Sequence, residues 1–140
     1  MSRSFGRAIL VVSTGVVVVS VVAGILVIGS PSEGRLEALD AGRIADLRGI
    51  MGETDLFWSR NQRLPRTLEE LAADPRTSVN TVDPGSTEPY SYRILDVDTY
   101  ELCATFDRAS RPLPGRSVAD FWQHGPGPQC FELDVDKEVR

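Results

Sequence analysis

Hydrophobic residues form one unbroken block near the N-terminus and shorter periodic patterns after it. The block, residues 8–29, holds 22 uncharged residues, mainly Val, Ile and Leu. As an α-helix it would extend about 33 Å, close to the ~30 Å hydrocarbon core of a bilayer. A lone strand in lipid would leave its backbone groups unpaired, so the block predicts one transmembrane helix. The alternative is a cleaved signal peptide, whose apolar region is usually only about 7–15 residues long.

The flanks of the apolar block bear on its orientation. Residues 1–7 carry Arg3 and Arg7 and no acid, and residues 30–35 form a predicted linker. Arg and Lys are nearly balanced on the two sides, but a short basic flank is easily retained in the cytoplasm. We therefore expect a cytoplasmic N-terminus, one membrane span and a C-terminal part outside the cytoplasm.

Small residues share one face of the apolar block. Ser13, Ser20 and Gly24 are seven and four residues apart, which places them on roughly the same side of a helix. Small residues four apart let membrane helices pack closely. This face is the candidate for contact with another transmembrane helix, and the simpler alternative is that such residues occur there by chance.

The next pattern repeats at three- and four-residue spacing and predicts an amphipathic helix over residues 36–60. Its apolar positions are Leu36, Leu39, Ile44, Leu47, Ile50, Met51, Phe57 and Trp58. The opposite, polar side collects Arg43, Asp46, Arg48, Glu53, Asp55 and Arg60. Thr67 and Glu70 then form a capping box, in which each side chain is expected to accept the backbone N–H of the other residue. The box predicts a short helix over residues 68–73.

Alternating residues in the second half predict three short strands, at 90–95, 99–106 and 130–135. One face of these strands is apolar: Tyr100, Leu102, Ala104, Phe106, Phe131, Leu133 and Val135. Only the amphipathic helix offers an apolar stripe large enough to cover that face. We therefore predict an α+β fold: an N-terminal transmembrane helix, then a domain over residues 36–135 in which the helix packs on a small antiparallel sheet, and a tail over residues 136–140. Trp58, Phe106 and Phe131 are the expected anchors of the core.

The part of the chain that follows the apolar block is acidic, which argues against nucleic acid as a partner. Residues 30–140 hold 13 basic and 20 acidic residues, a net charge of −7. The basic residues are dispersed, whereas proteins that grip nucleic acids cluster Lys and Arg. Nucleic acid is therefore not an expected partner.

The two cysteines, Cys103 and Cys130, both lie in predicted strands, each with carboxylates two residues away. Outside the cytoplasm this arrangement favours a disulfide between the last two strands. Closing that loop would stabilise the domain by roughly 3.5 kcal/mol in the chain-entropy model. The alternative is two buried free thiols. Two cysteines and one histidine do not complete a structural zinc site without a carboxylate.

Other polar residues are weaker candidates for chemistry. Asp96 and Asp98, with Asp83 or Asp107, offer oxygen ligands for calcium, but without the fixed spacing of a calcium loop they are better explained as solvated turn acids. His124 lies in a Gly/Pro turn with no neighbouring Ser or Cys in the sequence to serve as a nucleophile. Neither group predicts a metal, a cofactor or a catalytic residue.

Two segments resemble a known family. Residues 63–71, RLPRTLEEL, and residues 83–92, DPGSTEPYSY, follow a hydrophobic helix continued by an amphipathic one. Over residues 36–106 this order is similar to the major pseudopilins of type II secretion and their type IV pilin relatives, which implies a pilin-like periplasmic domain at a bacterial inner membrane. The family's Gly-Phe-Thr-Leu-x-Glu processing signal is missing, because residues 4–9 read SFGRAI. The resemblance therefore does not extend to peptidase processing or to filament assembly.

These observations lead us to expect a non-enzymatic, single-pass accessory or structural subunit. Its pilin-like domain would bind other membrane or envelope proteins, with the bilayer as its second partner and no small-molecule substrate. A loop rich in Arg and Pro is the candidate partner-binding segment: Arg108, Arg111, Pro112, Leu113, Pro114, Gly115 and Arg116. The alternatives are a divergent pseudopilin-like component of a secretion or pilus system, and a membrane-tethered hydrolase that uses His124.

Overall fold

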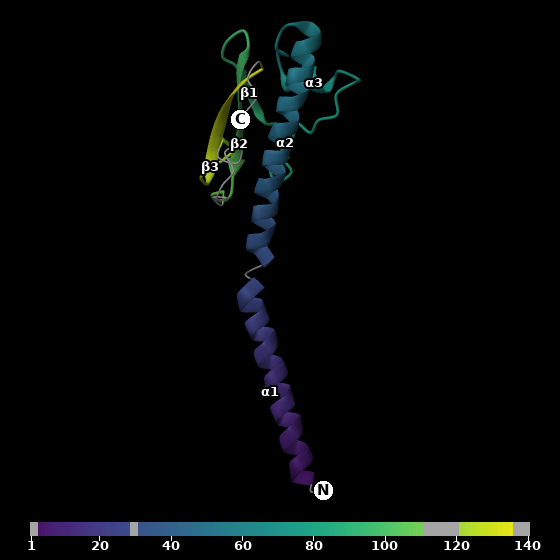
Figure 1. Cartoon of the computed structure of the whole chain (residues 1–140), viewed down its shortest axis with the longest axis vertical. Helices are drawn as coiled ribbons and strands as arrows, with labels where there is room; N and C mark the ends of the chain where they lie inside the picture. Colours follow the sequence, from purple (N-terminus) through teal and green to yellow (C-terminus); the bar gives the residue numbers. More distant parts are fainter. Residues whose placement is uncertain (1–2, 29–30, 111–120, 136–140) are drawn as a thin grey trace. The chain divides into compact units, whose positions relative to one another are not determined.

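The chain has the α+β composition that its sequence predicts. In a computed structural model, which describes residues 3–28, 31–110 and 121–135, the elements run α1 (Arg3–Ile28), α2 (Pro31–Asn61), α3 (Leu68–Ala72), β1 (Ser91–Ile94), β2 (Thr99–Phe106) and β3 (Gly127–Asp134) (Figure 1). The chain divides into two compact units, Met1–Arg35 and Leu36–Arg140. The tail predicted at residues 136–140 lies outside the described residues.

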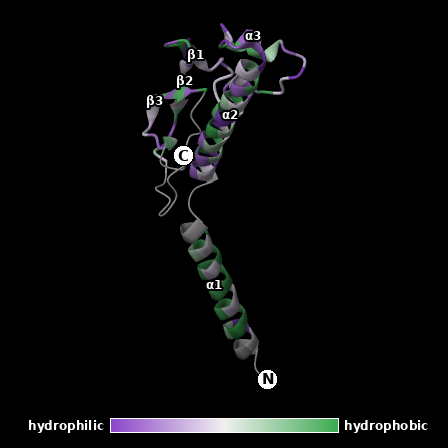
Figure 2. Cartoon of the chain, turned by 45° about the horizontal axis from the view of Figure 1, so that its top comes forward, coloured by the Kyte–Doolittle hydropathy of each residue, from purple (hydrophilic) through white to green (hydrophobic). Residues whose placement is uncertain are grey.

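The first unit contains an apolar helix. Within α1, the segment Gly6–Ile25 is 20 residues long and apolar enough to cross a membrane, and none of it is buried by other parts of the chain. In Figure 2 the ribbon of α1 is mainly green, the hydrophobic end of the scale, whereas α2 mixes green with white and purple. The segment is therefore a candidate membrane span, as the apolar block predicts.

The amphipathic helix α2 starts earlier than expected. It begins at Pro31, so residues 31–35, which the sequence pattern predicts to be a linker, are helical. Proline is compatible with the first turn of a helix because the N–H that it lacks has no partner there. Pro31 therefore starts this helix instead of breaking it.

The sheet is a three-stranded antiparallel meander in the order β1-β2-β3. β2 has the predicted bounds, while β3 begins at Gly127, three residues before the predicted start at Cys130. Gly127 has φ +98°, a conformation that favours glycine, and Pro128 pairs with Thr105 on the edge strand. An edge strand tolerates a proline, so the pairing extends through a segment whose composition indicated only a turn.

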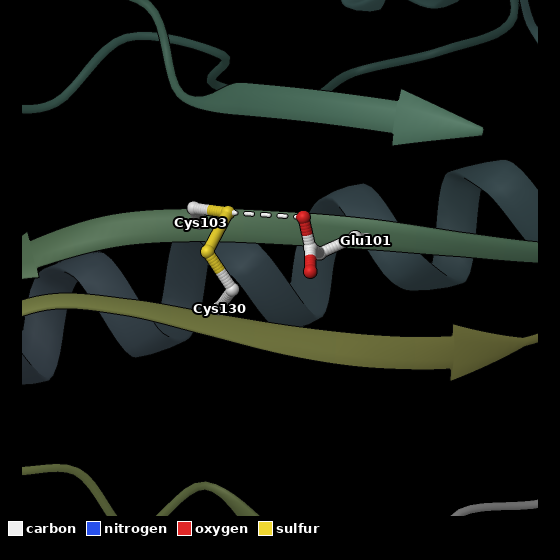
Figure 3. A group of neighbouring side chains, drawn as sticks. All are labelled: Glu101, Cys103 and Cys130. Atoms are coloured by element: carbon white, nitrogen blue, oxygen red, sulfur yellow. Dashed lines mark hydrogen bonds between the residues drawn. A yellow bond between two sulfur atoms is a disulfide. The ribbon is translucent and has the colours of Figure 1, made fainter. Parts of the chain in front are cut away.

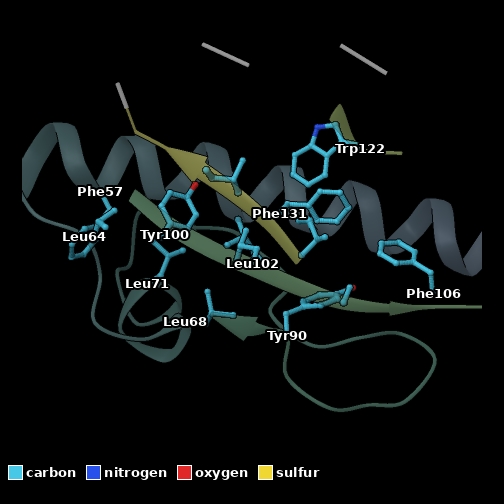
Figure 4. Close-up of a cluster of buried hydrophobic side chains, with 14 residues drawn as sticks. Phe57, Leu64, Leu68, Leu71, Tyr90, Tyr100, Leu102, Phe106, Trp122 and Phe131 are labelled. Atoms are coloured by element: carbon cyan, nitrogen blue, oxygen red, sulfur yellow. The ribbon is translucent and has the colours of Figure 1, made fainter. Parts of the chain in front are cut away.

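The core lies between α2 and the inner face of the sheet (Figure 4). It consists of Leu47, Ile50, Phe57, Leu64, Leu68, Leu71, Tyr90, Tyr100, Leu102, Ala104, Phe106, Trp122, Phe131 and Leu133. Phe106 and Phe131 are buried anchors, as predicted, and their rings meet edge to face with centroids 6.3 Å apart. Trp58 is only partly buried, and Trp122 instead packs on Phe131 with ring centroids 4.8 Å apart.

The short helix α3 keeps one half of its expected capping box. The Thr67 side chain accepts the N–H of Glu70, as predicted. Glu70 does not return to the N–H of Thr67, because its carboxylate accepts the N–H of Arg66 at 2.6 Å and pairs with the guanidinium of Arg63. The carboxylate thus links the helix start to the loop before it.

Candidate functional site

A buried arginine gathers three carboxylates beside α2. Arg43 is only 6% exposed, although the sequence pattern assigned it to the polar side of the helix. Its Nε donates to Asp83 at 2.7 Å, and its Nη1 donates to Asp40 and to Asp107, each at 2.7 Å. The Arg43 cluster, defined by these four residues, joins α2 to the turn before β1 and to the end of β2. One positive charge faces three negative ones.

Backbone donors complete the Arg43 cluster. Asp40 accepts the N–H groups of Asp107 and Arg108, at 3.0 and 2.9 Å, and Asp83 accepts those of Gly85 and Ser86, at 2.6 and 3.0 Å. These hydrogen bonds compensate the buried carboxylates for the water they have lost.

The pKa values in the cluster follow from the same contacts. Burial by itself raises the pKa of Asp83, but hydrogen bonds from Arg43 and from two backbone N–H groups outweigh it, and the net pKa is lowered. For Arg43, burial opposes the charged form, and hydrogen bonds to the three carboxylates raise the pKa above its ordinary value. Arg43 and Asp83 therefore both stay charged at neutral pH.

This arrangement corrects one expectation from the sequence. Asp83 and Asp107 were expected to be solvated turn acids, yet the Asp83 side chain is 9% exposed and Asp107, at 41%, pairs with Arg43. Asp96 and Asp98 lie in the turn at the opposite end of β2. The structure therefore does not assemble the four acids that were considered for calcium.

Next to the cluster, β2 extends beyond its neighbour. β1 begins at Ser91, opposite Cys103, so residues 104–106 of β2 have no partner in β1. The Cα atoms of Cys103 and Cys130 are 4.0 Å apart, the short spacing of a cross-strand pair that exchanges no backbone hydrogen bonds. Thr105 and Pro128 are paired two residues further along, so they also form a non-hydrogen-bonded pair. The N–H and C=O of Thr105 consequently point to the side where β1 has ended.

An open groove of about 750 Å³ lies along this strand edge. Its walls come from the first turns of α2 in the domain, from the segment before β1 and from the edge itself: Leu36, Leu39, Arg43, Asp83, Gly85, Ser86, Glu88, Pro89, Tyr90, Ser91, Cys103, Ala104, Thr105, Asp107 and Pro128. The chain before β1 turns away from β2, because the backbone N–H of Tyr90 donates to the carbonyl of Thr81 and Pro89 forms an isolated β-bridge with Val82. The groove is therefore the space that a longer β1 would occupy.

The outer face of the sheet carries the predicted disulfide. Cys103 and Cys130 are directly paired across β2 and β3 and are bonded to each other. Cys103 is half-buried and Cys130 is exposed. Glu101 lies beside them, with Oε2 3.7 Å from Cys103 Sγ, and Figure 3 shows its carboxylate next to the bonded sulfurs.

The histidine of the hydrolase hypothesis has a packing role. The His124 ring stacks on Phe106, with centroids 3.6 Å apart, and its Nδ1 faces the carbonyl of Gly125. The Ser110 hydroxyl contacts the backbone of His124 and not the imidazole. Among the described residues, no hydroxyl or thiol forms a hydrogen bond with this ring.

Most of the predicted partner-binding loop, Arg111, Pro112, Leu113, Pro114, Gly115 and Arg116, lies outside the described residues. Arg108 is described, and its backbone N–H donates to Asp40. On α1, the hydroxyls of Ser13 and Ser20 donate to carbonyls of their own helix, and a Cβ at Gly24 would meet nothing within 4 Å. The helix-packing and loop assignments remain predictions.

One buried polar pair was not singled out by the sequence. Asp55 Oδ1 and the Tyr100 hydroxyl are buried and have no hydrogen-bond partner in the described part of the chain. Burial raises the pKa of Asp55 to about 6. Burial, with the nearby charge of Asp55, also raises the pKa of Tyr100. Only the tertiary packing reveals that this acid lies near a buried ring.

Comparison with known proteins gives no family assignment. No family model, curated protein or solved structure matches this chain.

Proposed function

We propose that this chain is a membrane-anchored accessory subunit whose C-terminal domain binds a segment of another membrane or envelope protein. The observation that carries the proposal is the groove along the unpaired edge of β2. A strand edge with free backbone groups pairs readily with an extended segment, which gains affinity from main-chain hydrogen bonds and specificity from side-chain pockets. In this proposal α1 is a single span in a bacterial inner membrane, with the domain in the periplasm.

The chemistry of the groove indicates what the segment would carry. Asp83, Asp107 and Glu88 line it against one positive charge, that of Arg43. Glu88 is exposed, so its carboxylate is available to a partner. Leu36, Leu39 and Ala104 supply apolar wall. We infer an extended segment that alternates apolar residues with Lys or Arg, because charge complementarity steers such a segment into this groove.

The experiment is a selection with a phage-displayed library of random nonapeptides on the full chain in detergent micelles. The expected winners alternate apolar and basic residues and bind more weakly to Glu88→Lys. Asp96→Lys, which places the same charge change in the β1–β2 turn, serves as the matched control and should leave binding unchanged. A bound peptide should slow hydrogen exchange at the N–H of Thr105.

Two results would contradict this proposal. Selected peptides that lack basic residues, or that bind Glu88→Lys as tightly as wild type, would contradict the inference that the bound segment is basic. Unchanged exchange at Thr105 would show that the segment does not add to the strand edge. The pseudopilin alternative is tested separately, because it predicts that the native protein purifies with components of a secretion or pilus system.

A further inference from the structure

The outer face of the sheet brings together residues of types that bind metals, and one of them, Cys103, also lines the groove of the proposed function. One carboxylate oxygen of Glu101 and the sulfurs of Cys103 and Cys130 lie within 4.8 Å of one another. Glu132 is the direct cross-strand partner of Glu101, and alternation places it on the same face as Cys130. Two adjacent cross-strand pairs thus supply two sulfurs and two carboxylates.

We propose that reduction of the Cys103–Cys130 disulfide opens a site for a thiophilic divalent cation of the Zn²⁺ class. The two thiolates and Glu101 are the ligands, and Glu132 or water takes the fourth position. Cysteine and carboxylate ligands in a set of four suit tetrahedral Zn²⁺. The carboxylate that a two-cysteine zinc site requires is therefore present in the fold.

The spacing of the ligand atoms supports this assignment. Zn–S bonds of about 2.3 Å and Zn–O bonds of about 2.1 Å set ligand atoms roughly 3.6–3.8 Å apart in a tetrahedron. Cys103 Sγ and Glu101 Oε2 are already 3.7 Å apart. A disulfide sulfur carries no proton to donate, so this approach is not a hydrogen bond. Once the S–S bond is broken, the two sulfurs must separate, and Cys130 Sγ starts within 4.8 Å of a carboxylate oxygen of Glu101.

The covalent step balances with a dithiol as the reductant. One thiolate of the dithiol attacks a disulfide sulfur, and its second thiolate releases the mixed disulfide, so two electrons pass to the cysteines and the dithiol becomes a disulfide. Cys130 is exposed and accessible to this attack. Cation binding then displaces the two thiol protons and forms two metal–thiolate bonds.

The surroundings of the site make its carboxylate ligands separable from the fold and from the groove, because Cys103 is the one proposed ligand that lines the groove. The core lies on the opposite face of the sheet, so ligand substitutions on the outer face leave the buried residues in place. Arg93 pairs with Glu101 Oε2 at 2.8 Å and competes with the cation for that oxygen. Removing Arg93 and removing Glu101 should therefore change the metal affinity in opposite directions.

The test uses the full chain in detergent micelles and Co²⁺ as the probe. The disulfide is reduced with a phosphine, which becomes a phosphine oxide by taking oxygen from water and leaves no competing thiol. Titration without air should give tetrahedral d–d bands and thiolate-to-cobalt charge-transfer bands that saturate at one Co²⁺ per chain, and Zn²⁺ should displace the Co²⁺. The oxidised chain should show neither set of bands.

Variants assign the ligands. Glu101→Gln should weaken Co²⁺ binding by about tenfold or more, the loss typical even of outer-shell partners. Arg93→Ala should tighten it roughly 1.4- to fivefold, since exposed ion pairs contribute about 0.2–1 kcal/mol. Glu88→Gln changes an acid that is not one of the proposed metal ligands, so it is the control and should leave Co²⁺ binding unchanged. Circular dichroism of the reduced chain reports whether the domain stays folded.

Three outcomes would overturn the site. They are cobalt bands of equal strength in the oxidised chain, no thiolate bands in the reduced chain at roughly millimolar Co²⁺, and thiolate bands that Glu101→Gln does not weaken. The last outcome, with or without loss of the dichroism signal, would mean that two thiols bind cobalt without a site built by the sheet.

Discussion

At the residue scale, Arg43 decides how the start of the domain is held together. Its guanidinium donates to three carboxylates that are 3, 40 and 64 residues away in the chain. Removing one member of a buried ion pair leaves the others uncompensated, which costs more than the intact pair contributes. The cluster therefore orders three segments, and its failure would loosen all of them.

We expect Arg43→Met to destabilise the domain by about 3–5 kcal/mol at pH 7, because three carboxylates lose their shared partner. The measurement is denaturant unfolding of the full chain in micelles, followed by tryptophan fluorescence. Arg66→Ala removes an exposed arginine side chain and should change stability by less than about 0.5 kcal/mol. Equal stability of Arg43→Met and wild type would contradict the cluster's role.

The same cluster sets a pH dependence. The folded pKa of Asp83 is lowered, so its stabilising contribution is complete above the ordinary pKa of about 3.9 and is lost as the pH falls through the folded value. Protonation of Asp83 also removes a negative charge that Arg43→Met leaves uncompensated. The stability difference between wild type and Arg43→Met should therefore narrow from pH 7 to pH 3.

Asp55 gives the opposite pH dependence of stability, because its pKa is raised and not lowered. Its folded pKa of about 6 lies above the unfolded value of about 3.9, so wild type loses stability as the pH rises from 4 to 7. Asp55→Asn should increase the free energy of unfolding at pH 8 by up to about 1 kcal/mol, a figure reduced for partial exposure of the side chain. At pH 4 the gain should vanish. Glu88→Gln, measured at both pH values, should show no such difference.

At the element scale, α3 depends on its cap. Its five residues form less than two turns, and Thr67 satisfies the N–H of Glu70 at its start. Thr67→Ala should cost about 1 kcal/mol of stability. Ser78→Ala, in an exposed loop, is the control. A thermal unfolding curve unchanged by Thr67→Ala would show that packing of Leu68 and Leu71 alone holds the helix.

The pairing of β2 with β3 is reinforced by the disulfide, which closes a loop with a sequence separation of 27. Replacing both cysteines by alanine should lower the stability by about 3.5 kcal/mol in the chain-entropy model. Wild type in reductant and a metal chelator should unfold at the same denaturant concentration as the double variant. If the oxidised wild type also unfolded there, the bond would contribute nothing to folding.

At the scale of the whole molecule, α1 connects the proposed function to a compartment. The basic, acid-free N-flank and the single candidate span among the described residues predict that the C-terminus lies outside the cytoplasm. Alkaline phosphatase fused after Arg140 should therefore be active in a bacterial host, and the fusion should stay with membranes at alkaline pH. If only a cytoplasmic reporter fused at the same position were active, the predicted orientation would be wrong. The proposed periplasmic location of the partner would then be wrong as well.

Properties that depend on neighbouring residues were predictable from the sequence. A membrane span needs consecutive apolar residues, a strand with one buried face needs alternation, and a cap needs a hydroxyl at a fixed offset. The candidate span, the bounds of β2 and the Thr67 cap follow directly. The cysteine pairing also follows, because the chain holds only two cysteines and alternation places both on the outer face.

Properties that depend on what lies opposite a residue were decided by the tertiary structure. The buried side of α2 runs through Asp40, Arg43, Leu47, Ile50, Thr54 and Phe57, a three- and four-residue spacing that hydrophobicity alone shows only from Leu47 onward. A charge can occupy such a stripe only when distant partners meet it, here Asp83 and Asp107. Likewise, β3 continues through Pro128 because it is an edge strand, and the groove exists because the chain before β1 pairs elsewhere. The sequence determined which segments form helices and strands, and the spatial meeting of distant charges and strand edges determined the candidate site.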